Sequence, residues 1–177
     1  MRVSVTISGL TRLFGGDLAG VVEAARCADA AGIHQVVLPD HLAIGTRTDR
    51  YPFAPTFPSP PEEPWLEPVA TLAAIAAVTE RIRLGTGVLI PSNRIAPVTA
   101  HSIATINALA PGRVFLGLGT GHTAMRVMGQ DPMRVKEFRE YLRVVRALLD
   151  GEAVDYTYNG QTRAKHVDDF HGQIDAR

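Results

Sequence analysis

Apolar and polar positions follow two alternating periods along the chain, the twofold period of a strand and the 3.6-residue period of a helix. Every second residue of Val3–Ile7 is apolar, which predicts a first strand. Apolar residues then recur at helical spacing over Leu18–Ala31. Asp17 is suited to cap the start of this helix, and Gly32 is suited to end it. A second strand is predicted over His34–Leu38.

The same order of helix and strand is then repeated twice. An alanine-rich apolar helix is predicted from Pro68 to Glu80, followed by a strand that starts at Ile82. A further helix begins near Pro97, and a fourth strand begins at Val114. Strands separated by helices at intervals of about thirty residues are typical of β/α units. The pattern therefore predicts an α/β fold with a parallel sheet.

The C-terminal third of the chain predicts a different local structure. A short helix or turn over Thr123–Met128 precedes an amphipathic helix over Pro132–Leu149. Val154–Tyr158 reads as a strand, and Asn159-Gly160 favours a type I′ turn after it. From Gln161 the chain is polar without clear periodicity. We therefore divide it into a β/α unit over 1–160 and a polar tail of uncertain structure over 161–177.

A proline-rich loop insertion over 45–68 lengthens the interval between the second and third strands. It holds seven of the chain's twelve prolines, with aromatic residues between them. A disordered linker usually has fewer aromatics. The loop leaves the carboxyl end of a strand, where β/α loops build active sites. Two interpretations stay open, a lid or pocket wall and a surface excursion that packs its own aromatic side chains.

Composition and charge exclude several classes of function. Charged residues make up 20% of the 177, the formal net charge is zero, and no basic cluster occurs. This argues against nucleic acid and anionic membranes as partners. Apolar runs fall short of the roughly 18 residues of a membrane helix, and the N-terminus lacks the apolar region of a signal peptide. A lone cysteine, Cys27, forms no internal disulfide, which favours a cytoplasmic location.

Two predicted strands end in glycine-rich segments of similar design. Gly85-Thr86-Gly87 follows the third strand, and Gly117-Leu118-Gly119-Thr120-Gly121 follows the fourth. Glycine at the carboxyl end of a strand lets a flat ligand approach the backbone. The spacing of the second segment is not that of a dinucleotide-binding turn. We therefore expect a ring-shaped cofactor or substrate at this end of the sheet.

The order and spacing of four sequence blocks resemble one protein family. The blocks are Ala28–His41, Thr79–Val88, Pro111–Gly121 and Met133–Gly151. Together they resemble the N-terminal half of luciferase-like monooxygenases, in particular flavin- and deazaflavin-dependent oxidoreductases such as methylene-tetrahydromethanopterin reductases. The resemblance implies a partial TIM-type (β/α)8 barrel made of its first four to five β/α units. It also implies a small organic substrate and a cofactor that is either FMN or the deazaflavin coenzyme F420. The sequence of this half of a barrel does not distinguish between the two cofactors.

The resemblance further implies the site residues. His41 is the expected catalytic residue beside the ring, and a cis peptide is expected between Gly87 and Val88. Several deazaflavin-dependent members have a glutamate after the last glycine, where this chain has His122. From the residues alone, a structural interpretation stays open, in which Asp40 satisfies loop backbone and His41 is a packing residue. The expected cofactor-binding residues are Asp40, Thr86, Gly87, Val88, Gly119, Thr120, Gly121 and His122.

Chain length leaves two functions open. A complete barrel has eight strands and roughly 250 residues, whereas this chain supplies four barrel strands and a short hairpin. The first function is an oxidoreductase. The second is a catalytically incompetent half barrel that acts as a binding or assembly module. In either case we expect a homo-oligomer or a complementing half barrel, because open strand edges favour association. No metal site is expected, although His166, Asp168, Asp169 and His171 lie close together in the tail.

Overall fold

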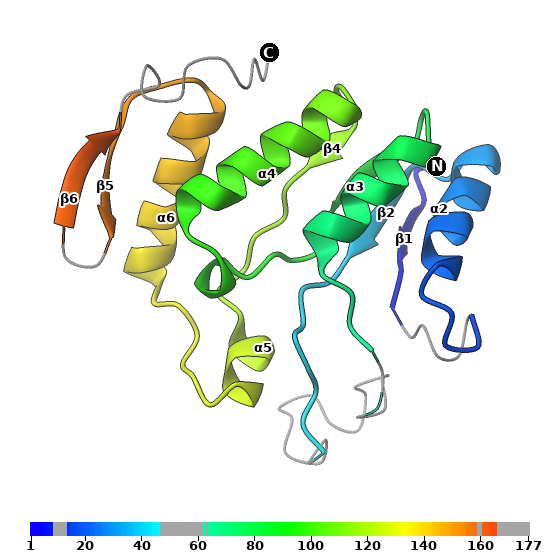
Figure 1. Ribbon diagram of the computed structural model, residues 1–177, viewed down its shortest axis with the longest axis horizontal. Helices are drawn as coiled ribbons and strands as arrows, with labels where there is room; N and C mark the ends of the chain where they lie inside the picture. The colour runs from blue at the N-terminus through cyan, green and yellow to red at the C-terminus, as the bar shows by residue number, and fades with distance from the viewer. Residues whose placement is uncertain (9–13, 47–61, 63, 159–160, 166–177) are drawn as a thin grey trace.

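The computed structural model describes the chain except for residues 9–13, 47–61, 63, 159–160 and 166–177. A parallel sheet has the order β1-β2-β3-β4. Helices α2, α3 and α4 lie side by side over one face of this sheet, and α6 continues the row beyond α4 (Figure 1). The predicted parallel α/β arrangement is confirmed. Its elements are β1 (Ser4–Thr6), α2 (Gly20–Ala30), β2 (Gln35–Leu38), α3 (Pro68–Val78), β3 (Arg83–Thr86), α4 (Ala96–Leu109) and β4 (Val114–Phe115).

The remaining elements follow β4, apart from one short 3₁₀ helix, η2 (Pro91–Asn93). They are α5 (His122–Val127), α6 (Val135–Leu149), β5 (Val154–Tyr158) and β6 (Gln161–Lys165). Within the predicted polar tail of uncertain structure, Gln161–Lys165 pairs antiparallel with β5. Such pairing satisfies the backbone without needing an apolar pattern. The predicted turn at 159–160 and the tail residues His166 to His171 lie outside the described residues.

The ends of α2 and the start of α3 test the predicted helix-capping residues. Gly32 adopts a left-handed φ of 76° directly after α2, as predicted. Asp17 is not the cap of that helix, which begins three residues later. The Asp17 carboxylate instead accepts the backbone N–H of Ala19 at 2.9 Å, in a turn before the helix. Pro68 begins α3 as predicted, and the Glu67 carboxylate caps it by accepting the N–H of Ala70 at 2.6 Å.

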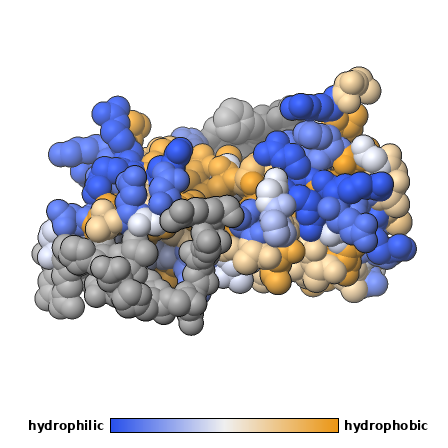
Figure 2. Space-filling view, turned by 90° about the horizontal axis from the view of Figure 1, so that it is seen from above, coloured by the Kyte–Doolittle hydropathy of each residue, from blue (hydrophilic) through white to orange (hydrophobic). Residues whose placement is uncertain are grey.

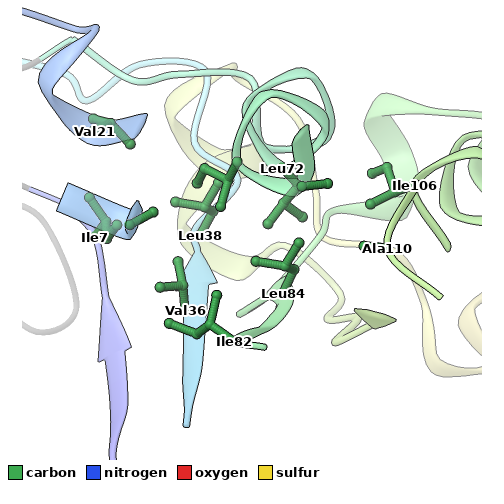
Figure 3. Packing of buried hydrophobic residues seen from close by; sticks show 12 residues of the cluster. Ile7, Val21, Val36, Leu38, Leu72, Ile82, Leu84, Ile106 and Ala110 are labelled. Atoms are coloured by element: carbon green, nitrogen blue, oxygen red, sulfur yellow. The ribbon is translucent and has the colours of Figure 1, made fainter. Parts of the chain in front are cut away.

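The main core lies between the sheet and α2, α3 and α4. Paired residues of parallel strands point to the same face, and Val36 and Leu84 are such a pair. Both are fully buried, together with Leu72 of α3 and Val21 of α2 (Figure 3). This core accounts for the buried face of α3. A smaller cluster joins α4 to α6.

The opposite face of the sheet carries a more polar set of side chains. Ser4, Gln35 and Arg83 occupy one level of the register, and the Gln35 amide donates to the Ser4 hydroxyl at 3.0 Å. On the next level, Val37 and Gly85 lie beside Phe115, whose ring is 5.2 Å from the Arg83 guanidinium. Such levels are the interior layers of a β/α barrel.

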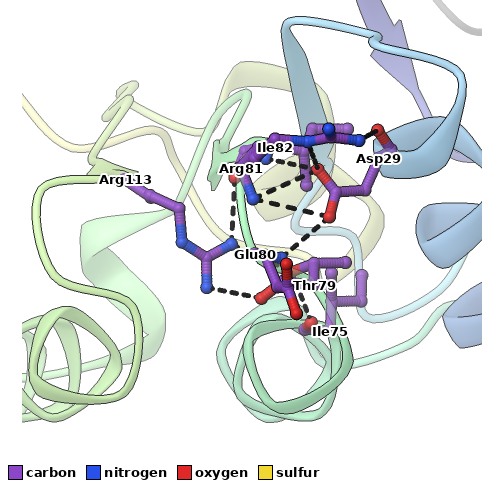
Figure 4. Close-up of polar contacts among 7 residues, drawn as sticks. All are labelled: Asp29, Ile75, Thr79, Glu80, Arg81, Ile82 and Arg113. Atoms are coloured by element: carbon purple, nitrogen blue, oxygen red, sulfur yellow. Dashed lines mark hydrogen bonds and ion pairs between the residues drawn. The ribbon is translucent and has the colours of Figure 1, made fainter.

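A buried carboxylate fixes the amino-terminal end of β3. Asp29 of α2 accepts the backbone N–H groups of Glu80, Arg81 and Ile82 at 2.8, 3.2 and 2.8 Å (Figure 4). Burial by itself raises the pKa of the Asp29 carboxyl, but these donors outweigh it and hold the pKa below its ordinary value. Asp29 thereby joins α2 to the turn between α3 and β3.

Arg113 completes this end of the sheet. Its guanidinium donates to the backbone oxygens of Thr79 at the end of α3 and of Ile82 (Figure 4). It also donates to the backbone oxygen of Ala76. A cation at a helix C-terminus satisfies carbonyls that have no partner within the helix.

No helix in the described part of the chain is long and apolar enough to cross a bilayer.

One hydrogen bond between α4 and α6 gives a simple stability test. The hydroxyls of Thr99 and Tyr141 are 2.5 Å apart and buried, and burial raises the pKa of Tyr141. Tyr141→Phe is expected to lower the free energy of unfolding by about 1 kcal/mol, because the Thr99 hydroxyl loses its partner. Urea unfolding followed by circular dichroism measures this. Thr105→Ala, which removes an exposed bond within α4, is the control, and equal effects would contradict the prediction.

Candidate active site

The carboxyl ends of β2, β3 and β4 meet along one edge of the sheet, which we call the rim. The rim comprises residues 39–41, 86–90 and 117–122. Gly87 donates its N–H to Leu38 at 2.9 Å. Leu89 donates to Gly117 at 2.7 Å, and Gly119 donates back to Leu89 at 3.1 Å. These bonds bring together all three segments in which site residues were predicted.

Asp40 ties the rim segments to one another. Its side chain is 1% exposed and accepts the backbone N–H of Ile90 at 2.8 Å. It also accepts Nη1 of Arg94 at 2.6 Å. Of the two roles that the sequence left open, the structure shows the fixing of loop backbone. A cofactor contact by Asp40 stays a prediction.

His41 lies next to Trp65, which comes from the far end of the proline-rich loop. The two ring centroids are 4.7 Å apart, and the planes are inclined by 42°. Burial lowers the pKa of the His41 imidazole, and the neighbouring Asp40 carboxylate opposes this only in part. The ring is therefore uncharged at neutral pH, and an uncharged imidazole both accepts and donates a proton. Most of the loop, including the predicted lid or pocket wall, lies outside the described residues.

The protonation of His41 gives a second test. Its proton NMR titration is expected to have a midpoint below about 6.5, the ordinary value for histidine. Because the unfolded chain binds this proton more readily, the contribution of His41 to stability falls as pH decreases from the ordinary pKa to the lowered one. A His41→Gln variant assigns the resonance. A midpoint at or above the ordinary value would contradict the prediction.

The end of β3 combines buried and open positions. Thr86 is buried, and its hydroxyl donates to the backbone oxygen of Gly117 at 2.8 Å. The peptide bond between Gly87 and Val88 is cis, as the family resemblance implied. Gly87 and Val88 are both exposed. The third strand thus offers its Gly87–Val88 surface to a ligand, while the Thr86 side chain serves to join two strands.

The rim glycines have a physical reason within the protein itself. A Cβ at Gly117 would lie 2.3 Å from the backbone oxygen of Thr86. A Cβ at Gly119 would lie 2.6 Å from Val88, and a Cβ at Gly121 would lie 2.6 Å from Ile90. The glycines let neighbouring strand ends pack closely.

The last predicted residues surround the start of α5. Gly121 adopts a left-handed φ of 82° and precedes the helix. His122 is its first residue and is exposed. Thr120 is partly exposed, and its backbone oxygen accepts the N–H of Met133 at 3.0 Å. The rim therefore places His122 at its open edge.

Three further residues at the rim were not predicted from the sequence. Trp65 packs on His41, and Arg94 binds both Asp40 and Glu67. One signal was available, since Arg94 is the only Asp, Glu, Lys or Arg between Arg83 and Arg113. A single charge within a long apolar stretch indicates a specific partner.

The family model for luciferase-like monooxygenases matches residues 3–176. The chain belongs to this family. Curated relatives include the F420-dependent glucose-6-phosphate dehydrogenase of Beutenbergia cavernae, with 38% identity over 143 residues, covering 74% of this chain and 38% of that protein. The enzyme of the same name from Nocardia farcinica is 43% identical over 96 residues, covering 50% of this chain and 29% of that protein. This chain spans about two fifths or less of these two enzymes.

Solved structures share the fold. The F420-dependent secondary alcohol dehydrogenase in complex with an F420-acetone adduct has a TM-score of 0.71 and 18% identity, covering 98% of this chain and 49% of that one. The FMN complex of the oxygenating constituent of 3,6-diketocamphane monooxygenase from Pseudomonas putida has a TM-score of 0.68 and 17% identity, covering 93% and 43%. The chain thus corresponds to about half of a luciferase-like barrel, as predicted.

Proposed function

We propose that this chain forms part of an oxidoreductase that binds a reduced deazaflavin or flavin at the rim. The observation that carries the proposal is the convergence of His41, the exposed Gly87–Val88 pair and His122 at the carboxyl edge of one parallel sheet. In α/β folds of this type, ligands bind at that edge. The substrate in this proposal is a small organic molecule.

The residues of the rim fit a planar ring with polar edges. Val88 of the rim and Leu42, which directly follows the 39–41 segment, are exposed apolar side chains, at 40% and 53%, and they supply apolar contact area. Two buried donors, the indole N–H of Trp65 and the amide of Asn93, have no hydrogen-bond partner within the described part of the chain. Buried donors without partners are uncommon, and they favour a ligand that carries acceptor oxygens.

In this proposal the bound ring supplies hydride transfer or oxygen chemistry. Gly87 and Val88 support one face of the ring, and Val88 excludes water there. His41 is uncharged and half-buried, so its imidazole accepts a proton from a substrate hydroxyl or returns one to it. Asp40 keeps the His41 backbone in place through its bonds to the loop after β3.

The relatives favour the deazaflavin over FMN. The curated proteins with F420-dependent names reach 34 to 43% identity with this chain. We therefore propose coenzyme F420 as the first cofactor to test. The expected cytoplasmic location stays a prediction.

A titration tests cofactor binding directly. Purified chain is added to F420 or to FMN, and quenching of the ring fluorescence is followed. Val88→Asp is expected to weaken binding by roughly tenfold or more, since a carboxylate beneath an apolar ring must lose its hydration. Val135→Asp, at an exposed position at the start of α6, is the matched control. Absence of binding to either cofactor would contradict the proposal, as would equal affinities of the two variants.

A second function, assembly, is favoured by a separate observation. Helices α3 and α4 contain no Asp, Glu, Lys or Arg, yet Val78, Val98 and Leu109 are 42, 48 and 54% exposed. In Figure 2, hydrophobic atoms gather along the lower edge, on the side where α3 and α4 lie. Exposed apolar side chains gathered on neighbouring helices mark association surfaces. We propose that this surface joins two copies of the chain. Light scattering after size-exclusion chromatography should give a dimer or larger, and a folded monomer would contradict this.

A further inference from the structure

One guanidinium bridges two carboxylates at the rim. Nη1 of Arg94 lies 2.6 Å from Asp40, and Nη2 is paired with Glu67. The Arg94 side chain is 13% exposed and that of Asp40 is 1% exposed. Burial acts to lower the pKa of Arg94, but the two carboxylates outweigh it and raise that pKa. The cation therefore keeps its charge inside the protein.

Each of the two carboxylate residues is close in the sequence to one of the two aromatic residues. Asp40 directly precedes His41, and Glu67 follows Trp65 by two positions. Glu67 also caps α3. Arg94 thus connects the end of β2 to the start of α3, and it holds both chain segments from which the rings of His41 and Trp65 project.

Arginine suits this position for a geometric reason. Its planar group carries five N–H donors in a fixed fork, which reaches two acceptors at once in a defined orientation. A lysine ammonium keeps the charge but concentrates it on a single nitrogen. Removing the cation altogether leaves the buried Asp40 carboxylate without its partner, which is costly.

We propose that Arg94 is a positioning residue, which sets the relative orientation of the His41 and Trp65 rings by holding Asp40 and Glu67. The catalytic relevance of this inference rests on the proposed function, in which His41 exchanges the proton. The inference about ring geometry does not depend on any cofactor.

Trp65 is the only tryptophan of the chain, so its fluorescence reports on the ring pair alone. A protonated imidazole beside an indole quenches its emission, so the wild-type emission should fall as pH decreases through the titration of His41. His41→Gln should abolish this pH dependence. The measurement uses the chain as purified, without cofactor, and includes acrylamide quenching to follow access to the indole.

Arg94→Lys and Glu67→Gln are the informative variants, because each weakens the bridge and leaves Asp40 intact. Both are expected to shift the Trp65 emission to longer wavelength, to raise acrylamide quenching and to diminish the pH-dependent quenching. Two controls separate positioning from general loss of stability. Arg143→Met removes an exposed ion pair on α6, and Asp29→Ala lowers stability at the opposite end of the sheet. Neither control should alter the Trp65 signal.

Wild-type emission, quenching and pH dependence in both bridge variants would overturn the inference. So would equal changes in Asp29→Ala, since the signal would then follow stability. The two proposals fail separately. If the bridge variants alter the Trp65 signal but the wild type binds neither F420 nor FMN, ring positioning stands and the proposed function fails. If the wild type binds cofactor but the Trp65 signal of the bridge variants is unchanged, the proposed function stands and ring positioning fails.

Discussion

Gly117→Ala is expected to lower the free energy of unfolding by about 3 kcal/mol. The added Cβ would lie 2.3 Å from the backbone oxygen of Thr86, and a backbone atom has no alternative rotamer. The Thr86 hydroxyl at the end of β3 also donates to the Gly117 carbonyl after β4. Moving either segment to make room for the methyl group therefore breaks this hydrogen bond. Urea unfolding followed by circular dichroism measures the loss. Binding of F420 or FMN should weaken at the same time, because the displaced backbone carries Gly87.

Gly45→Ala is the matched control. Nothing lies within 4 Å of the Cβ position at Gly45, whose φ is outside the left-handed region. The new methyl group therefore has space, and the free energy of unfolding should stay close to the wild-type value. If Gly117→Ala were as stable as Gly45→Ala, the close packing of strand ends would be wrong as the explanation of the rim glycines.

Asp29→Ala is expected to lower the free energy of unfolding by about 3 kcal/mol at neutral pH. The substitution leaves the backbone N–H groups of Glu80, Arg81 and Ile82 without their common acceptor, and that of Ile82 is buried. Thermal and urea unfolding measure the effect. Asp17→Ala, whose carboxylate accepts one exposed N–H, should cost much less.

The effect of Asp29 should depend on pH with a definite sign. Its pKa is lowered in the folded chain, so the unfolded chain binds the proton more readily. The stabilisation is therefore complete above the ordinary pKa of about 3.9 and is lost as pH falls toward the lowered value. The difference between wild type and Asp29→Ala should shrink over that acid range. A difference that grows with acidity would show that Asp29 does not hold its partners as a carboxylate.

The order of helices and parallel strands was predictable because it depends on local periodicity. Alternation over 3–7 and helical spacing over 18–31 each require only near neighbours. The bounds of the second hairpin strand, β6, were not predictable because Gln161–Lys165 is polar and its stability comes from pairing with β5. Local capping rules were reliable at Pro68 and Gly32 but not at Asp17, where the carboxylate serves a turn instead.

The candidate site was predictable only where the chain direction places residues at strand ends. Asp40, Gly87 and Gly121 follow successive strands, so the topology alone brings them to one edge. The partners of Asp40 were not predictable, because Arg94 lies 54 positions away in the chain. Nor does a sequence show which neighbouring atoms lie where a Cβ would be at a glycine. That information requires the neighbouring strand.

The Asp29 and Arg113 contacts and the rim lie at opposite ends of the same short strands and share no residue. One end of the sheet holds the helices in register, while the other carries exposed positions such as Val88 and His122. A combinatorial library confined to Leu42, Val88 and His122 would therefore vary ligand preference while leaving the contacts of Asp29 and Arg113 unchanged. Variants from such a library should differ in what they bind far more than in the temperature at which they melt.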